Sequence, residues 1–177
     1  ISCALNAMVN NDLDYTDIKE VKVTAFAQAY DILFDPTKYR PESRETADHS
    51  LPYCMAAAIV DKKITTASFS DEKLNDPRIF EVIDKIVGEP SLEFEAMFPA
   101  KQPSRVVVTT NDGRQFEEYM EYPKGDPRQP MTMDDLTNKF NGLAEASLSA
   151  ERMQEVKDLI FACEQVSARD FMAKLVV

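Results

Sequence analysis

The chain is short of basic residues, of histidine, of cysteine and of long hydrophobic runs, and the first of these shortages bears on its partners. Its 177 residues include 20 Lys and Arg against 31 Asp and Glu, which gives a formal net charge of −11. A protein that binds nucleic acid needs clustered Lys and Arg to neutralise phosphates, so this balance argues against nucleic acid as a partner. A local positive pocket can still attract an anionic small molecule to an acidic protein.

No hydrophobic run approaches the roughly 18 residues that a membrane-spanning helix needs, and no basic segment followed by an apolar one opens the chain as a secretory signal would. The three cysteines, Cys3, Cys54 and Cys163, are odd in number and widely spaced. This pattern fits neither a disulfide framework nor a zinc or iron–sulfur site. Each lies in an apolar, helix-like setting, which predicts buried free thiols in a reducing compartment. We therefore expect a cytoplasmic protein that does not bind membranes.

Hydrophobic periodicity predicts helices along much of the chain. The run from Leu51 to about Asp61 is apolar on every face, with Ser50 as N-cap and Pro52 in the first turn, which predicts a helix buried on all sides. The other expected helices are residues 1–10, 65–74, 78–86, 132–148, 149 to 163 or 164, and a short one that Ser167 caps; residues 27–34 are ambiguous.

Strand signals are fewer. Alternation of apolar and charged residues predicts a strand near 20–26. Two β-prone runs within 105–122 flank Asn111-Asp112-Gly113, and this Asp-Gly turn predicts a β-hairpin. Because strands and helices do not alternate strictly, the fold class is α+β, with a small antiparallel sheet packed with several helices.

Two segments are expected to be irregular. Residues 35–47 carry two prolines and many charges, which is typical of a long loop, and long ordered loops in compact domains are often functional. Gly88 and Pro90 are expected to break the chain between the helix at 78–86 and the hairpin.

The only histidine, His49, directly precedes the apolar run, and Arg44 lies five positions before it. Imidazole has an unperturbed pKa near neutrality, so His49 is the candidate acid–base residue. A helix N-terminus beside a histidine and an arginine suits a small carboxylate ligand, and the N-terminus should favour the neutral imidazole. Arg44 can hold a carboxylate with two parallel N–H bonds, while Ser50 and Tyr53 can donate hydrogen bonds to it.

Each of these four residues also has a purely structural explanation. His49 can bond the preceding loop, and Arg44 can form an ion pair with a neighbouring acid of its own segment. Ser50 can serve only as the N-cap, and Tyr53 can lie in the core. The sequence shows no cluster of residues with metal-ligand spacing.

Two segments together resemble the C-terminal part of the MmgE/PrpD family: RETADHSLPY at 44–53 and YPKGDPRQPMT at 122–132, in the same order on either side of the hairpin. That family includes 2-methylcitrate dehydratases, cis-aconitate decarboxylases and an iminodisuccinate epimerase. The resemblance implies that residues 1–177 are the lid-like C-terminal α+β domain of a two-domain protein, usually a homodimer, whose N-terminal helical domain is missing here.

The same resemblance implies a site and a reaction. In the decarboxylase branch a histidine at the position of His49 is catalytic, and a basic residue at the position of Arg44 faces the site. The substrate would be a di- or tricarboxylate, and no cofactor would be used. We expect a hydro-lyase that dehydrates 2-methylcitrate or a close analogue, and we expect the isolated 177 residues to be inactive. The alternatives are cis-aconitate decarboxylation, iminodisuccinate epimerisation, or a non-catalytic binding or assembly module.

Overall fold

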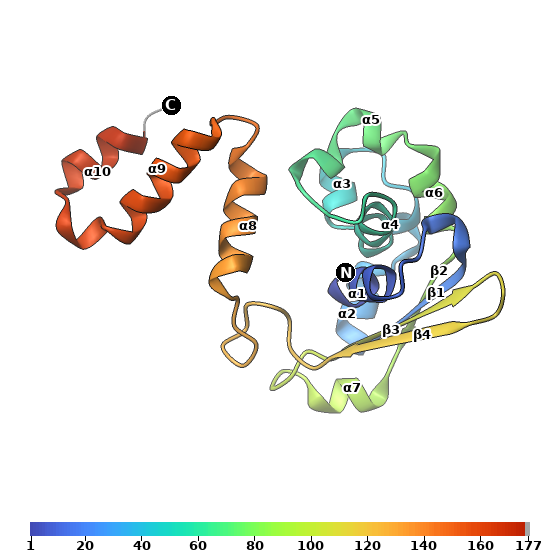
Figure 1. The fold of residues 1–177 in the computed structure, drawn as a ribbon. Coiled ribbons are helices and arrows are strands. Elements are labelled where there is room, and N and C mark those ends of the chain that lie inside the picture. The colour runs from blue at the N-terminus through green and yellow to red at the C-terminus, as the bar shows by residue number, and fades with distance from the viewer. Residues whose placement is uncertain (176–177) are drawn as a thin grey trace. The chain divides into compact units, whose positions relative to one another are not determined.

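The computed structural model describes residues 1–175, which divide into two compact units. Unit 1 is Ile1–Pro130, and unit 2 begins at Met131. Figure 1 shows that the strands all belong to unit 1, whereas the described part of unit 2 is helical. Within the described residues, every helix is too short or too polar to cross a membrane. Helices and a separate small sheet confirm the α+β class.

Unit 1 is built on a four-stranded sheet with the order β2–β1–β3–β4. Strand β1 (Ile18–Ala25) pairs antiparallel with β3 (Ser104–Thr110), and β3 pairs antiparallel with β4 (Gln115–Met120). Strand β2 (Ile86–Pro90) runs parallel to β1. The small antiparallel sheet that the sequence predicts is therefore confirmed for β1, β3 and β4, and the parallel edge strand β2, which was not expected, makes the sheet mixed.

Strand β2 also corrects the expected helix at 78–86 and the expected break after it. Helix α6 (Pro77–Ile83) ends early, and Ile86 is buried as the first residue of β2. Gly88 pairs with Val23 of β1, and a glycine fits this position because an added Cβ would lie 2.6 Å from the Phe34 ring. Pro90 is tolerated because it ends an edge strand, where a missing N–H costs no ladder bond.

The predicted hairpin is confirmed as β3 and β4. Gly113 adopts φ +88° in the turn, a conformation that glycine adopts without steric cost. The hydroxyl of Thr110 donates to the Asp112 carboxylate and so closes the turn. Val106 and Val108 alternate inward along β3 and are buried.

Helices cover the face of the sheet to which these valines point. Figure 1 shows α1 (Ser2–Asn10) and α4 (Leu51–Asp61) on this side, with α6 packed against α4. Residues 52–59 of α4 are all buried, which confirms the prediction of a helix buried on every side. Short α7 (Leu92–Met97) packs on the other face through Phe94, whose ring lies near Arg105 and Tyr119.

The segment before α4 is more regular than the long loop expected at 35–47. After α2 (Ala27–Leu33) come the 3₁₀ turn η2 (Pro36–Tyr39) and helix α3 (Arg44–Asp48). Local side-chain caps produce this order: Asp35 accepts from the Thr37 amide, and Ser43 accepts from the Thr46 amide. The remaining short elements are η1 (Tyr15–Asp17), η3 (Thr66–Phe69) and α5 (Asp71–Leu74).

Unit 2 contains α8 (Met133–Ala144), α9 (Ala150–Phe161), the turn η4 (Cys163–Gln165) and α10 (Ala168–Leu175). These helices confirm the ones expected near 132–148, near 149–164 and after Ser167. Cys163 is exposed, so the prediction that all three thiols are buried is wrong for this residue, whereas Cys3 and Cys54 are buried. Cys163 follows the end of α9 in a unit where Val156 is the one described residue that is buried.

Candidate functional site

His49 lies at the elbow between two helices of unit 1. It is the C-cap of α3, with φ −97° and ψ 12°, and Ser50 directly after it is the N-cap of α4. The imidazole side chain is 72% exposed. The lone histidine is thus held at a fixed backbone position while its ring remains open to solvent.

The ring faces the last turn of α3, not the N-terminus of α4. Its Nδ1 lies 3.0 Å from the carbonyl oxygen of Glu45 and 2.5 Å from Oδ1 of Asp48. These acceptors, first the Glu45 carbonyl and then Asp48, raise the pKa of His49 above its ordinary value, while nearby Lys38 opposes the rise. The expectation that a helix N-terminus favours neutral imidazole is therefore wrong, because the ring interacts with a helix C-terminus, which favours a cation.

Ser50 secures this elbow. Its hydroxyl accepts from the Tyr53 amide at 3.1 Å and donates to the carbonyl of Lys38 at 2.5 Å, so it joins α4 to η2. The Tyr53 hydroxyl donates to the carbonyl of Ser68 at 2.9 Å, and burial raises its pKa to about 12. Both side chains are buried in the described structure and hold the helix that follows His49. A role for either in substrate binding stays a prediction.

Two cations belong to the same stretch of chain. Arg44 is the first residue of α3 and is exposed, and among the described residues its side chain has no hydrogen bond or ion pair. The alternative of an ion pair with a neighbouring acid is therefore not what the structure shows. Lys38 comes from η2, and its charge is close enough to act on the His49 ring.

An open pocket of about 410 Å³ lies beside this elbow. Lys38, whose charge also acts on the His49 ring, lines it, whereas neither His49 nor Arg44 is among its lining residues. Arg40 lines it as well, but Asp84 holds its guanidinium at 2.5 Å. The other lining residues are Thr37, Pro41, Glu42 and Thr46. Sequence reasoning missed Lys38, and the only signal was its place in a charged segment expected to be functional.

Comparison with known proteins places this chain in a family. Residues 1–163 match the MmgE/PrpD C-terminal domain. The chain belongs to the MmgE/PrpD family. The match covers all of unit 1 and continues through α8 and α9 of unit 2.

Relatives of this MmgE/PrpD chain are named for two reactions. Cis-aconitate decarboxylase of Aspergillus terreus is 27% identical over 130 residues, which cover 72% of this chain and 26% of the relative. Cis-aconitate decarboxylase of Mus musculus is 26% identical over 135 residues, covering 76% and 28% respectively. The 2-methylcitrate dehydratase-like protein oryR of Aspergillus oryzae is 28% identical over 134 residues, covering 71% and 27%. The chain thus spans about a quarter of the length of these relatives.

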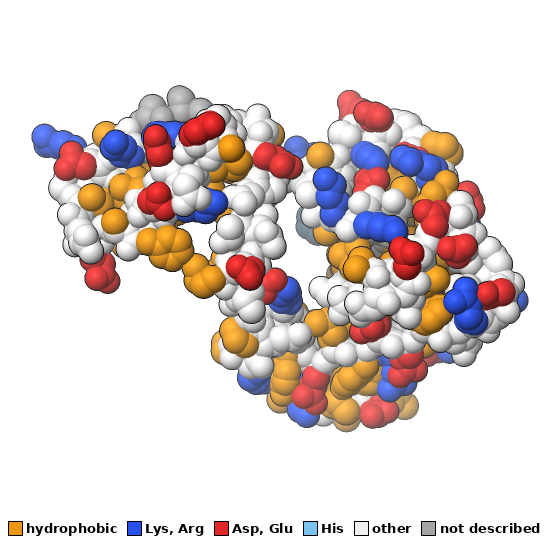
Figure 2. All heavy atoms as spheres, in the orientation of Figure 1, with side chains coloured by type: hydrophobic (Ala, Val, Ile, Leu, Met, Phe, Trp, Pro, Cys, Tyr) orange, Lys and Arg blue, Asp and Glu red, His pale blue; other side chains and the backbone are white. Residues whose placement is uncertain are grey.

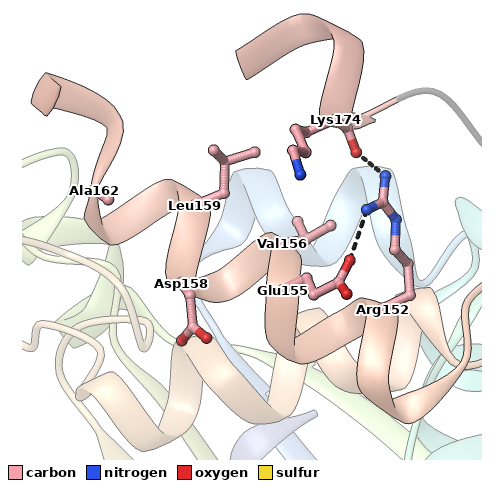
Figure 3. Close-up of a pocket in the computed structure, with 7 residues that line it drawn as sticks. All are labelled: Arg152, Glu155, Val156, Asp158, Leu159, Ala162 and Lys174. Atoms are coloured by element: carbon pink, nitrogen blue, oxygen red, sulfur yellow. Dashed lines mark hydrogen bonds and ion pairs between the residues drawn. The ribbon is translucent and has the colours of Figure 1, made fainter. Parts of the chain in front are cut away.

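Other concave surfaces of this MmgE/PrpD chain are less suited to an acidic ligand. A pocket of about 400 Å³ in unit 2 contains Arg152, but Figure 3 shows its guanidinium directed to Glu155 and to the Lys174 carbonyl. Arg152 pairs with Glu155 of the same helix at 2.8 Å and donates to the Lys174 carbonyl of α10, so its guanidinium joins α9 to α10 instead of facing a ligand. A second pocket in unit 2, between α8 and α9, is lined mainly by apolar side chains.

Charged side chains of both signs are interspersed over the face of unit 1 that Figure 2 shows. Within residues 1–175, no three His, Cys, Asp or Glu side chains come together in a way that could hold a metal ion. An exposed imidazole can exchange protons, and ammonium and guanidinium groups can attract carboxylates. A role of His49 or Arg44 in a reaction stays a prediction.

Proposed function

We propose that this chain is the C-terminal part of a lyase that acts on a tricarboxylate, and that His49 exchanges a proton with the substrate. The observation that supports the proposal most is the exposed imidazole, held by Nδ1 at the α3–α4 elbow, where the charge of Lys38 also acts on it. Membership in the MmgE/PrpD family supports the class of reaction, since relatives are named as decarboxylases and a dehydratase-like protein.

Both candidate reactions, dehydration and decarboxylation, require proton transfer and stabilisation of negative charge. Dehydration requires a base that removes a proton from a carbon next to a carboxylate, and an acid that helps hydroxide leave. Decarboxylation requires a proton for the carbon that loses CO2. Both pass through an enolate-like charge that cationic groups stabilise. Imidazole can give or take the proton, while Arg44 and Lys38 provide positive charge for carboxylates.

We consider two substrates. Dehydration of 2-methylcitrate is our main proposal, on the resemblance of the two sequence segments. Decarboxylation of cis-aconitate is the second, because several similar relatives carry that name. The remaining groups of the site would come from a helical region that precedes these residues in the longer protein, so we propose that the 177 residues alone do not turn over either substrate.

The test is an assay of the longer protein that contains this chain, offered 2-methylcitrate and cis-aconitate separately. Loss of water without CO2 supports dehydration, and release of CO2 supports decarboxylation. Replacement of His49 by Ala should lower kcat by about 10²–10⁴-fold, the usual contribution of a general acid or base. Because the ring is exposed, the same change should leave the urea midpoint of unit 1 in place.

Gln28→Ala is the matched control, since Gln28 is exposed on α2 and its side chain has no hydrogen bond among the described residues. It should keep wild-type kcat. Near-normal turnover by the His49→Ala protein would end the proposed role of the imidazole. If neither substrate reacts with the wild-type protein, the non-catalytic binding module becomes the better explanation.

A further inference from the structure

The two contacts of the His49 ring fix which of its nitrogens carries the proton. Nδ1 lies 3.0 Å from the Glu45 carbonyl oxygen and 2.5 Å from Asp48 Oδ1. A carbonyl and an ionised carboxylate only accept hydrogen bonds, so Nδ1 must be the donor. In neutral imidazole the other nitrogen, Nε2, then bears the lone pair.

We propose that Asp48 is a positioning residue, whose carboxylate and the Glu45 carbonyl hold the Nδ1–H of His49 so that Nε2 exchanges the proton with the substrate. The catalytic role of Asp48 rests on the function proposed above for His49. The tautomer itself can be observed whether or not the chain belongs to a lyase.

The local fold keeps Asp48 beside the ring. Asp48 is the last residue of α3, and the preceding Ala47 is fully buried against the core. The Cys54 thiol lies 3.5 Å from the Ala47 carbonyl and 3.7 Å from the Asp48 carbonyl, so the first turn of α4 supports this backbone. Because Ser50 is bonded to the Lys38 carbonyl of η2, the elbow is fixed on both sides of the Asp48–His49 pair.

Groups from two elements act on the charge of the His49 ring in opposite directions. Glu45 contributes its carbonyl and Asp48 its carboxylate from α3, while Lys38 contributes a positive charge from η2. The two acceptors act more strongly than the ammonium, so the pKa of His49 is raised. Asp48 therefore orients the ring and favours its protonated form, which suits a group that must return a proton to carbon.

A single histidine makes the experiment unusually clean. In a ¹⁵N–¹H correlation spectrum of the 177-residue chain, all imidazole signals come from His49. Above its pKa, wild type should show the Nδ1–H tautomer. Asp48→Asn should shift the signals toward the Nε2–H tautomer and lower the pKa of His49, because the asparagine amide carries no charge and can itself donate to Nδ1.

Asp31→Asn is the matched control: Asp31 is exposed on α2, and its carboxylate has no ion pair among the described residues. It removes the same charge and should leave the tautomer and the pKa of His49 near wild type. An Nε2–H tautomer in wild type, or equal shifts in both variants, would overturn the assignment of Asp48.

The catalytic arm uses the longer protein and compares Asp48→Asn with Asp48→Glu. We expect Asp48→Asn to lower kcat about tenfold, with the pH limb that reports the imidazole moving to lower pH. Asp48→Glu should recover most of the rate and the original limb, because it restores an anionic acceptor. A uniform loss of kcat at every pH, without recovery by Glu, would indicate a merely structural role and overturn the proposal.

The two proposals fail in different ways. If His49→Ala keeps its activity, the proposed function of the imidazole fails, and the tautomer measurement still decides whether Asp48 orients the ring. If His49→Ala loses activity while Asp48→Asn keeps the wild-type tautomer, kcat and pH profile, only the role of Asp48 fails.

Discussion

Unit 1 and unit 2 treat their apolar side chains in opposite ways. Unit 1 buries large residues completely, among them Tyr53, Phe94 and Met55. In unit 2 the apolar side chains of α8 and α9 are largely at the surface, and Phe161 is 70% exposed. Figure 2 shows apolar side chains on the exterior of the helical unit.

The sheet explains this difference. In unit 1, segments far apart in sequence, among them α1, α4 and α6, share one core on one face of the sheet, while α7 packs Phe94 on the other face. The described part of unit 2 has only three helices and two short connections, too little chain to enclose a core. Its order therefore depends more on capping and helix propensity than on burial.

Thiol reactivity is the property in which the units should differ most. Cys54 in unit 1 is buried, and burial raises the pKa of its thiol to about 11, while burial also raises the pKa of Cys3. Since the thiolate is the nucleophile, we expect iodoacetamide at pH 8 to modify the exposed Cys163 at least about a hundredfold faster than either. Peptide mass spectrometry over time measures all three rates.

Concentrated urea is the control, because unfolding should make the three rates similar. Native-state labelling of Cys54 as fast as that of Cys163 would show that the elbow around α4 opens readily. In that case the rigidity that we assign to the α3–α4 elbow, and with it the fixed position of His49, would be lost.

The sequence predicts the parts of the fold that depend on local pattern. The apolar run of α4, the Asp-Gly hairpin and the helices of unit 2 all have strong periodicity or turn chemistry. Strand β2 was beyond such reasoning, because Gly88 and Pro90 oppose a strand locally. Packing of Phe34 on Gly88 and pairing with β1 override that preference.

In the candidate site too, the sequence predicts some residues, whereas other contacts depend on the folded structure. A lone histidine before a buried helix, with an arginine five positions earlier, draws attention to His49 and Arg44, and family resemblance supports both. The sequence does not reveal that Lys38 approaches the ring from η2, because this depends on how Ser50 bonds the Lys38 carbonyl. The sequence also does not reveal that the Asp48 carboxylate contacts Nδ1 of His49, since adjacent residues on a helix do not face each other. The non-helical C-cap conformation of His49 makes this contact possible.

Matched N-cap substitutions sharpen the comparison of the two units. Ser50→Ala removes a buried cap that also satisfies the Lys38 carbonyl, and we expect it to destabilise unit 1 by about 2 kcal/mol. Ser149→Ala removes only the exposed cap of α9, which accepts from the Arg152 amide, and should cost about 0.5–1 kcal/mol locally. All six tyrosines lie in unit 1, so tyrosine fluorescence in urea reports the first effect alone.

Hydrogen exchange of α9 amides reports the effect of Ser149→Ala. Ser50→Ala should not accelerate exchange in α9, and Ser149→Ala should not move the tyrosine transition. If Ser50→Ala costs no more than Ser149→Ala, the bond to the Lys38 carbonyl contributes little, and the elbow is held mainly by apolar packing of α4.

The smallest expected effects come from replacing one glycine in each unit by alanine, and they should have opposite signs. An added Cβ meets nothing within 4 Å at either Gly113 or Gly142, so backbone conformation alone decides. Gly113 has φ +88°, and Ala there should destabilise unit 1 by about 1 kcal/mol in the tyrosine-monitored urea transition. Gly142 lies inside α8, where Ala is the better helix former, and its replacement should stabilise α8 by up to about 1 kcal/mol.

This gain should slow hydrogen exchange of α8 amides by up to about fivefold. A helix that owes its order to propensity must respond to such a change, whereas one fixed by tertiary packing would not. Unchanged exchange in Gly142→Ala would therefore mean that α8 is held by packing after all, and the contrast between a core-stabilised unit 1 and a propensity-stabilised unit 2 would not stand.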